Sequence, residues 1–202
     1  MDYPDDELNL AFARNVRKWA AMTNYLSFWV YDASFPTYPL PVPNMRAIEP
    51  NIRFIVAHKG IGVFMQGAYN ALGGDFSDLR AYLISRLLWD PNLNGQQLMD
   101  EFLDLHYGRA ATPIRRYINF LHDDAESKGK TRSCMGTEAD YKIEDEIIRT
   151  GLDAFDEALQ LADDDVIRAR VEKASIAAYC AAIAEPSFWT WENRNREVSA
   201  AN

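Results

Sequence analysis

The sequence has few of the residues that build metal sites and disulfide scaffolds. It contains two cysteines, Cys134 and Cys180, and three histidines, His58, His106 and His122. The cysteines form no CxxC motif and predict free thiols, and the histidines show no ligand spacing. We therefore expect no metal and no other cofactor.

Basic residues are scarce as well. Lys and Arg number 21 against 30 Asp and Glu, which gives a net charge of -9. Nucleic acids and anionic membranes bind clustered basic residues, so we expect neither as a partner. No run approaches the roughly 20 apolar residues of a membrane span. The first residues, MDYPDDELNL, are acidic and polar, unlike a secretory signal peptide, and the compartment stays open.

The first 92 residues alternate between helical and strand patterns. Apolar residues at helical spacing predict a helix over 7–22, with one buried stripe. Its members are Leu8, Phe12, Val16 and Trp19. Short runs of aromatic and β-branched residues predict strands over 26–32 and 61–67, covered on both faces as in a parallel sheet. Further helices are predicted over 50–59, with Pro50 in the first position, and over 77–89.

The spacing of the two strands favours a barrel. They begin about 35 residues apart, close to the repeat of a (β/α)8 fold. We therefore predict an α/β protein in which residues 1–92 form the last βα units of an incomplete TIM-like barrel. Residues 93–202 are predicted to form an α-helical C-terminal region, because their apolar residues recur at helical spacing. The alanine-rich helix over 165–184 suits close helix packing.

Two parallel strands do not make a sheet that is stable by itself, because both edges stay open. We therefore expect this chain to be the C-terminal portion of a larger barrel, with the N-terminal half missing and the chain alone inactive. The alternative is that the helices wrap around the strand pair.

The active site of a barrel enzyme lies at the C-terminal ends of its strands. The first strand ends in Trp29, Tyr31 and Asp32, and the second in Gln66 with Tyr69 beyond it. Tyr38 and Asn44 lie in the proline-rich loop between them. Aromatic faces beside carboxylate and amide groups suit sugars, since rings pack on the C–H face and polar groups bond the hydroxyls. Each ring also fits core packing, and Asp32 also fits a turn.

Glycoside hydrolysis needs two carboxyl groups in most families. Only Asp32 is found at a strand end. Asp75 opens the helix over 77–89, where an N-cap role is expected. This chain is thus expected to carry at most one member of a catalytic pair. No GxSxG, GxGxxG or phosphate-loop motif is present.

Three segments carry a resemblance to a known family. They are WVYDASFPTYPLPVPN, NIRFIVAHKGIGVFMQG and DFSDLRAYLISRLLWDPNLNGQQLMDEFLDLHYGRAATPIRRYI. Together they resemble the C-terminal half of the bacterial "domain of unknown function 4838" proteins. The resemblance implies a glycoside-hydrolase-like barrel, similar to that of α-glucuronidases and β-hexosaminidases, with a helical tail and a carbohydrate-linked role. It implies pocket positions for Tyr31, Asp32, Asn44 and Gln66.

Two functions remain open from the sequence. The first is a glycoside-hydrolase-like protein acting on a glycan, such as one with uronic acid or N-acetyl groups. In it Asp32 is the catalytic carboxyl, and Trp29, Tyr31, Tyr38, Asn44, Gln66 and Tyr69 bind substrate. The second is a non-catalytic carbohydrate-binding or structural helical module.

Overall fold

The structure is a computed structural model that describes residues 7–68, 74–129, 134–135 and 143–184. The chain runs through α1 (Glu7–Met22), β1 (Leu26–Tyr31), α2 (Met45–Ala57), β2 (Gly60–Gln66), α3 (Ser77–Trp89), α4 (Gly95–Tyr107), a 3-10 turn η1 (Gly108–Ala110), α5 (Ala111–Ser127), α6 (Asp145–Leu161) and α7 (Asp165–Ala184). None of these helices is both long and apolar enough to span a bilayer.

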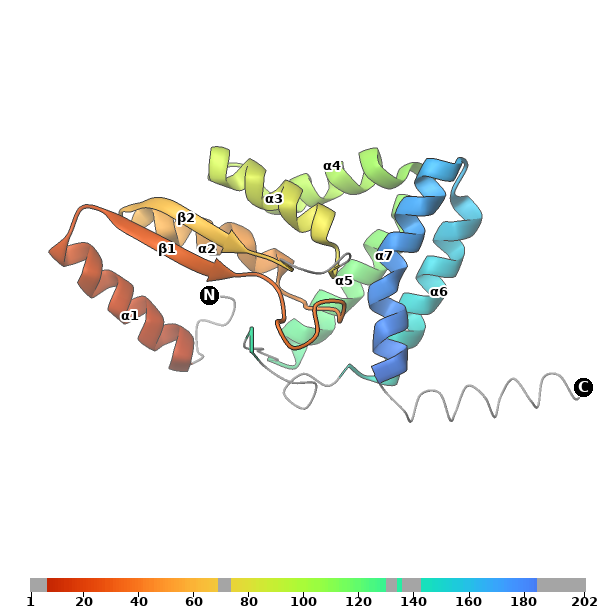
Figure 1. The fold of residues 1–202 in the computed structure, drawn as a ribbon, viewed down its shortest axis with the longest axis horizontal. Helices are drawn as coiled ribbons and strands as arrows, with labels where there is room; N and C mark the ends of the chain where they lie inside the picture. The colour runs from red at the N-terminus through yellow and green to blue at the C-terminus, as the bar shows by residue number, and fades with distance from the viewer. Residues whose placement is uncertain (1–6, 69–73, 130–133, 136–142, 185–202) are drawn as a thin grey trace, which may run out of the picture.

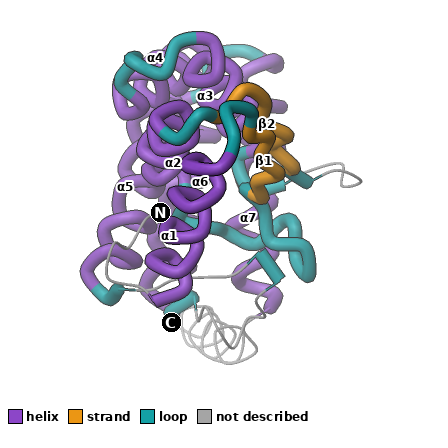
Figure 2. The backbone as a smooth tube through the Cα atoms, turned by 90° about the vertical axis from the view of Figure 1, so that its left-hand side faces the viewer, coloured by secondary structure: helices purple, strands orange, loops and turns teal. Residues whose placement is uncertain are grey.

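The strands β1 and β2 pair in parallel through the crossover helix α2. Figure 1 shows this β1–α2–β2 unit on one side of the molecule with α1, while α6 and α7 stand on the other side and α5 lies between. Figure 2 shows the two strands at the margin of the helices. One face of the sheet is turned toward the helical core, since Met65 packs against it.

The barrel prediction for residues 1–92 is wrong. In the described ranges the sheet has two strands, and both outer edges are free of a further strand. The spacing of β1 and β2 suggested a repeating unit, but the apolar residues after α3 recur at helical spacing and form α4 and α5. Outside these two strands, the regular structure of the described part is helical. This arrangement is closer to the alternative, in which helices accompany a strand pair.

The helix α1 has the predicted bounds but not the predicted buried face. Leu8, Phe12 and Trp19 are 80%, 53% and 59% exposed, whereas Val16 is buried with Ala13 and Ala20. The guanidinium of Arg17 lies 5.8 Å from the ring centroid of Phe54, which places α1 beside α2. The helix rests on its row of small residues because the described chain offers no cover for the larger ones.

The helix α2 begins earlier than predicted. It starts at Met45, and Pro50 lies inside it instead of at its first position. Met45, Ile48 and Ile52 on the first turns are buried, so burial of this apolar face outweighs the hydrogen bond that a proline cannot donate. This shift places Asn44 directly at the start of the helix.

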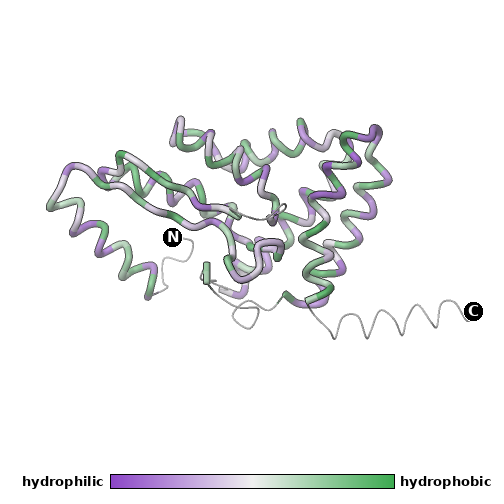
Figure 3. The backbone as a smooth tube through the Cα atoms, viewed as in Figure 1, coloured by the Kyte–Doolittle hydropathy of each residue, from purple (hydrophilic) through white to green (hydrophobic). Residues whose placement is uncertain are grey.

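A single cluster of buried side chains links the two sides of the molecule. It includes Ile52 of α2, Leu83 of α3, Leu103 of α4, Tyr117 of α5 and Phe155 of α6. Figure 3 shows hydrophobic and hydrophilic residues alternating along these helices, as expected for elements with one buried face. The alanine-rich α7 packs closely, as predicted, with Ala174, Ala177, Ala178, Ala181 and Ala182 buried.

His122 connects α5 to the start of α2 inside the protein. Its Nε2 accepts a hydrogen bond from the backbone N–H of Met45 at 3.1 Å, and its Nδ1 lies 2.8 Å from the carbonyl oxygen of Ile118. The ring must therefore be neutral, with the proton on Nδ1. Burial lowers the pKa of His122 to about 4, and the positive charges of Arg46 and Arg80 act in the same direction.

We predict that His122 makes the fold sensitive to mild acid. The pKa of an unfolded histidine is 6.5, so the unfolded chain takes up this proton first. The stability that neutral His122 contributes is complete above pH 6.5 and is lost as the pH falls toward 4. Between about pH 7 and about pH 4.5 the free energy of unfolding should fall by about 2 kcal/mol from this group.

Urea denaturation of the wild type and of His122→Gln at both pH values tests this, because glutamine can still accept the Met45 hydrogen bond. Each protein loses some free energy of unfolding between the two pH values, and the difference between these losses gives the contribution of His122 alone. Asp32 and Asp75 contribute equally in both proteins, and their raised pKa values act in the opposite direction. Equal losses of unfolding free energy in both proteins would contradict this role of His122.

Candidate functional site

Side-chain alternation along β1 separates the residues at its end. The register pairs Trp29 with Phe64 and Tyr31 with Gln66, and these four lie on one face of the sheet. Val30 pairs with Met65 on the opposite face. Asp32 continues the Val30 row, and its N–H still bonds the carbonyl of Gln66 at 3.2 Å. Asp32 therefore points toward α3, away from Trp29 and Tyr31.

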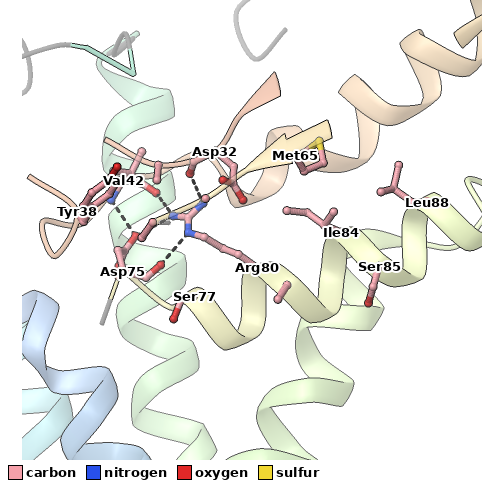
Figure 4. A pocket seen from close by; sticks show the side chains of 15 residues that line it. Asp32, Tyr38, Val42, Met65, Asp75, Ser77, Arg80, Ile84, Ser85 and Leu88 are labelled. Atoms are coloured by element: carbon pink, nitrogen blue, oxygen red, sulfur yellow. Dashed lines mark hydrogen bonds and ion pairs between the residues drawn. The ribbon is translucent and has the colours of Figure 1, made fainter. Parts of the chain in front are cut away.

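A buried guanidinium holds this strand end in place. Arg80 of α3 is 5% exposed, and each of its N–H groups has an acceptor. Its Nε donates to the Asp75 carbonyl at 2.8 Å, and its Nη2 donates to the Val42 carbonyl at 2.6 Å and to Asp75 Oδ2 at 2.7 Å. Its Nη1 donates to the Asp32 carbonyl at 3.3 Å and to Asn44 Oδ1. We call Arg80 with these acceptors the Arg80 clamp, and Figure 4 shows it without Asn44.

The clamp also fixes the proline-rich loop between β1 and α2. The N–H of Val42 donates to Asp75 Oδ2 at 2.9 Å, and the N–H of Asp75 donates to the carbonyl of Tyr38 at 3.2 Å. Asn44 uses its other polar atom, Nδ2, to bond the Asp32 carbonyl at 3.2 Å. A loop that has no regular structure is thus tied to Asp75 just before α3 and to Asp32 just after β1.

The Asp32 side-chain carboxyl group, unlike its backbone carbonyl, takes no part in the clamp. Its side chain is buried, and Oδ1 has no hydrogen-bond partner. A Cβ added to Gly67 would lie 3.3 Å from that oxygen, so a glycine here lets the backbone pass close to the carboxyl group. Burial raises the pKa of Asp32, and the nearby charge of Arg80 only partly offsets this.

The N-cap role expected for Asp75 is wrong. Phe76, with a φ of 47°, occupies the N-cap position of α3, and Asp75 does not cap the helix. Its Oδ2 instead accepts from Val42 and Arg80, while its Oδ1 has no hydrogen-bond partner. Burial raises the pKa of Asp75, whereas the charge of Arg80 lowers it. In the sequence, the spacing of five residues between Asp75 and Arg80 in GGDFSDLR was the only signal for this ion pair.

Next to the clamp lies a cavity of about 500 Å³, which we call the Asp32 pocket. Met65 of β2 and Ile84 and Leu88 of α3 form an apolar wall, and Asp32 and Asp75 line the polar end. Figure 4 shows Asp32 on one side of this space and the α3 side chains across from it. The size and the mixed lining are typical of small-molecule sites.

A series of rings leads from the open sheet face to the pocket. Neighbouring ring centroids are 4.7 Å apart for Phe64 and Trp29, 6.4 Å for Trp29 and Tyr31, 5.1 Å for Tyr31 and Phe35, and 5.6 Å for Phe35 and Tyr38. We call these five residues the aromatic row. Trp29, Phe64 and Tyr31 are 64%, 55% and 46% exposed, and Tyr38 lines the pocket.

The predicted site residues thus fall into three places. Asp32 and Tyr38 line the pocket, whereas Trp29, Tyr31 and Gln66 lie on the open face, where Trp29 Nε1 donates to Gln66 Oε1 at 2.8 Å. Asn44 belongs to the clamp. Tyr69 lies outside the described residues. Within the described ranges, no three potential metal ligands from His, Cys, Asp and Glu come together.

We predict that Arg80 is required for stability. Arg80→Met leaves the buried Asp75 carboxylate without a countercharge, which should lower the free energy of unfolding by about 3–5 kcal/mol. Arg116→Met is the matched control, since its ion pair with Glu157 is half exposed and should contribute at most about 1 kcal/mol. Denaturant unfolding near neutral pH measures both. A loss at Arg80 no larger than that at Arg116 would contradict the clamp.

Comparison with known proteins identifies the family but adds no relative of known structure. No curated protein and no solved structure matches the chain. The family model described as "Domain of unknown function (DUF4838)" matches residues 3–119, which is more than half of the chain and includes the aromatic row, the Arg80 clamp and the Asp32 pocket. The chain belongs to this family of domain of unknown function 4838 proteins.

Proposed function

We propose that this protein binds carbohydrate along the aromatic row, with one end of the ligand in the Asp32 pocket. The observation that carries the proposal is a continuous row of rings, exposed at one end, that leads to a pocket lined by a buried carboxyl group. Rings that stay exposed in a folded protein offer flat apolar faces, onto which the C–H face of a sugar can pack.

The pocket complements the rings. A sugar has hydroxyl groups that donate hydrogen bonds, and Asp32 lines the pocket with a carboxyl group whose buried Oδ1 has no hydrogen-bond partner. The wall of Met65, Ile84 and Leu88 suits the apolar edge of a pyranose. Because the clamp fixes the loop that carries Phe35 and Tyr38, the rings need little ordering when the ligand binds.

Trp29 provides a direct test of the binding surface. Its side chain is largely exposed, so Trp29→Ala should leave stability nearly unchanged, yet it should weaken binding of neutral cello-, xylo- or chito-oligosaccharides by about tenfold. Trp19→Ala on α1 is the matched control, because Trp19 is similarly exposed and lies outside the row. Isothermal titration calorimetry measures both variants.

Equal affinities of the Trp29 and Trp19 variants would contradict a role for the aromatic row. Failure of the wild type to bind any of these oligosaccharides would contradict the proposal as a whole.

A second candidate is glycoside hydrolysis, and the raised pKa of Asp32 favours it. A raised pKa favours the protonated carboxyl group, which is the form that can act as a general acid toward the glycosidic oxygen. The usual second carboxyl group is less available, because Asp75 Oδ2 is held by Arg80 and Val42. Binding therefore stands as the primary proposal, and hydrolysis is the reaction class that Asp32 would serve.

Release of reducing ends from the oligosaccharides that bind separates the two candidates. If Asp32 transfers a proton, Asp32→Asn should lower the rate by at least about a hundredfold, since general acids contribute 10²–10⁴-fold. Asp153→Asn, on the exposed side of α6, should keep the wild-type rate. Equal rates in the wild type and Asp32→Asn would remove Asp32 from the chemistry, and binding without any release would leave the binding function alone.

A further inference from the structure

The charge balance of the Asp32 pocket restricts which sugars it can accept. Arg80 is the only basic side chain among its described lining residues. Every N–H of its guanidinium already donates to an acceptor in the protein, so it has none left for a ligand carboxylate.

Negative charge in the pocket exceeds positive charge. The lining includes two carboxyl groups, Asp32 and Asp75, against one guanidinium. Arg80 bonds Asp75 Oδ2 directly, but it reaches Asp32 only through the backbone carbonyl. Each carboxyl group keeps one buried oxygen without a hydrogen-bond partner. A buried carboxylate that lacks a partner is costly, and a cation nearby would relieve this cost.

We propose that the Asp32 pocket selects a sugar bearing a protonated amino group and rejects a sugar bearing a carboxylate. This inference rests on the proposed carbohydrate function and narrows its substrate class. An ammonium group in the pocket supplies both a positive charge and hydrogen-bond donors to the Asp32 side. A uronate would add a further negative charge beside two carboxyl groups and find no free cation in the described lining.

Burial raises the pKa values of Asp32 and Asp75, because the single charge of Arg80 does not compensate both carboxylates, and a bound cation would favour their ionised forms. The apolar wall of Met65, Ile84 and Leu88 strengthens the effect. Charges interact more strongly where water is partly excluded, so a single unit of ligand charge should change affinity about ten- to a hundredfold.

The test uses methyl glycosides of glucosamine, N-acetylglucosamine, glucose and glucuronic acid, compared by ligand-observed NMR at a pH that keeps the amine protonated. The glucosamine derivative should bind about ten- to a hundredfold more tightly than the two neutral sugars, and the glucuronide more weakly than either. The N-acetyl derivative separates the effect of charge from the effect of a nitrogen substituent, since acetylation removes the positive charge and keeps the nitrogen.

The net charge of -9 attracts any cation, so a charge-matched variant is needed. Asp32→Asn and Asp153→Asn each remove one negative charge, but only the first lines the pocket. The preference for glucosamine should shrink at least about fivefold in Asp32→Asn and persist in Asp153→Asn. An equal reduction in both variants would overturn the inference, because the preference would then reflect the field of the whole protein.

The outcomes separate the two proposals. Binding of all four sugars with equal affinity, or tighter binding of the glucuronide, overturns the charge selection and leaves the carbohydrate function standing. Binding of none of the four, together with none of the neutral oligosaccharides, overturns both.

Discussion

The buried guanidinium of Arg80 is the interaction on which the rest of the site depends. It joins the end of β1 and the adjoining proline-rich loop to the first turn of α3, since Arg80 lies 48 residues after Asp32 and 38 residues after Val42. The proline-rich loop has no regular hydrogen-bonding pattern of its own. Without the clamp, the buried carbonyl groups of these segments would need other donors, and the position of Asp32 relative to α3 would no longer be defined.

The clamp also explains why one aspartate is structural and the other is available. Asp75 lies beside Arg80, so its carboxylate is used to neutralise the guanidinium and to bond Val42. Asp32 contributes only its carbonyl to the clamp, and this leaves its carboxyl group at the pocket. The Arg80 clamp thus fixes the proline-rich loop and leaves the Asp32 carboxyl group free of it, next to the pocket. A carbohydrate whose hydroxyl or ammonium groups donate to this side is the ligand that the arrangement suits best.

Much of the local structure could be predicted from the sequence. Helical spacing predicted the bounds of α1 and α3, and the aromatic run LSFWVY predicted β1. Local patterns could not show whether the two strands belong to a barrel, because the number of strands in a sheet depends on pairing between distant segments. The exposed face of α1 was misjudged for a related reason, since periodicity shows which residues share a face but not whether another element covers it.

The candidate site shows the same division. The sequence placed Asp32 and the rings at one strand end, but side-chain alternation sends Asp32 to the α3 side and Trp29 with Tyr31 to the open face. The role of Asn44 could not be predicted, because its partners Arg80 and Asp32 come from other elements. The N-cap expectation for Asp75 was wrong because a buried countercharge outweighs a cap of about 1 kcal/mol.

The central claim is that the aromatic row and the Asp32 pocket form one continuous carbohydrate site. Amide and indole NMR spectra recorded during titration with a neutral oligosaccharide test it most directly, because the Trp29 indole N–H, bonded to Gln66, reports on the open face. The backbone amides of Ala81 and Ile84 report on the pocket. The account predicts that these signals shift together and saturate at the same ligand concentration, while those of α6 and α7 stay in place. Shifts confined to α6 and α7, or none at Trp29 and Ile84, would contradict it.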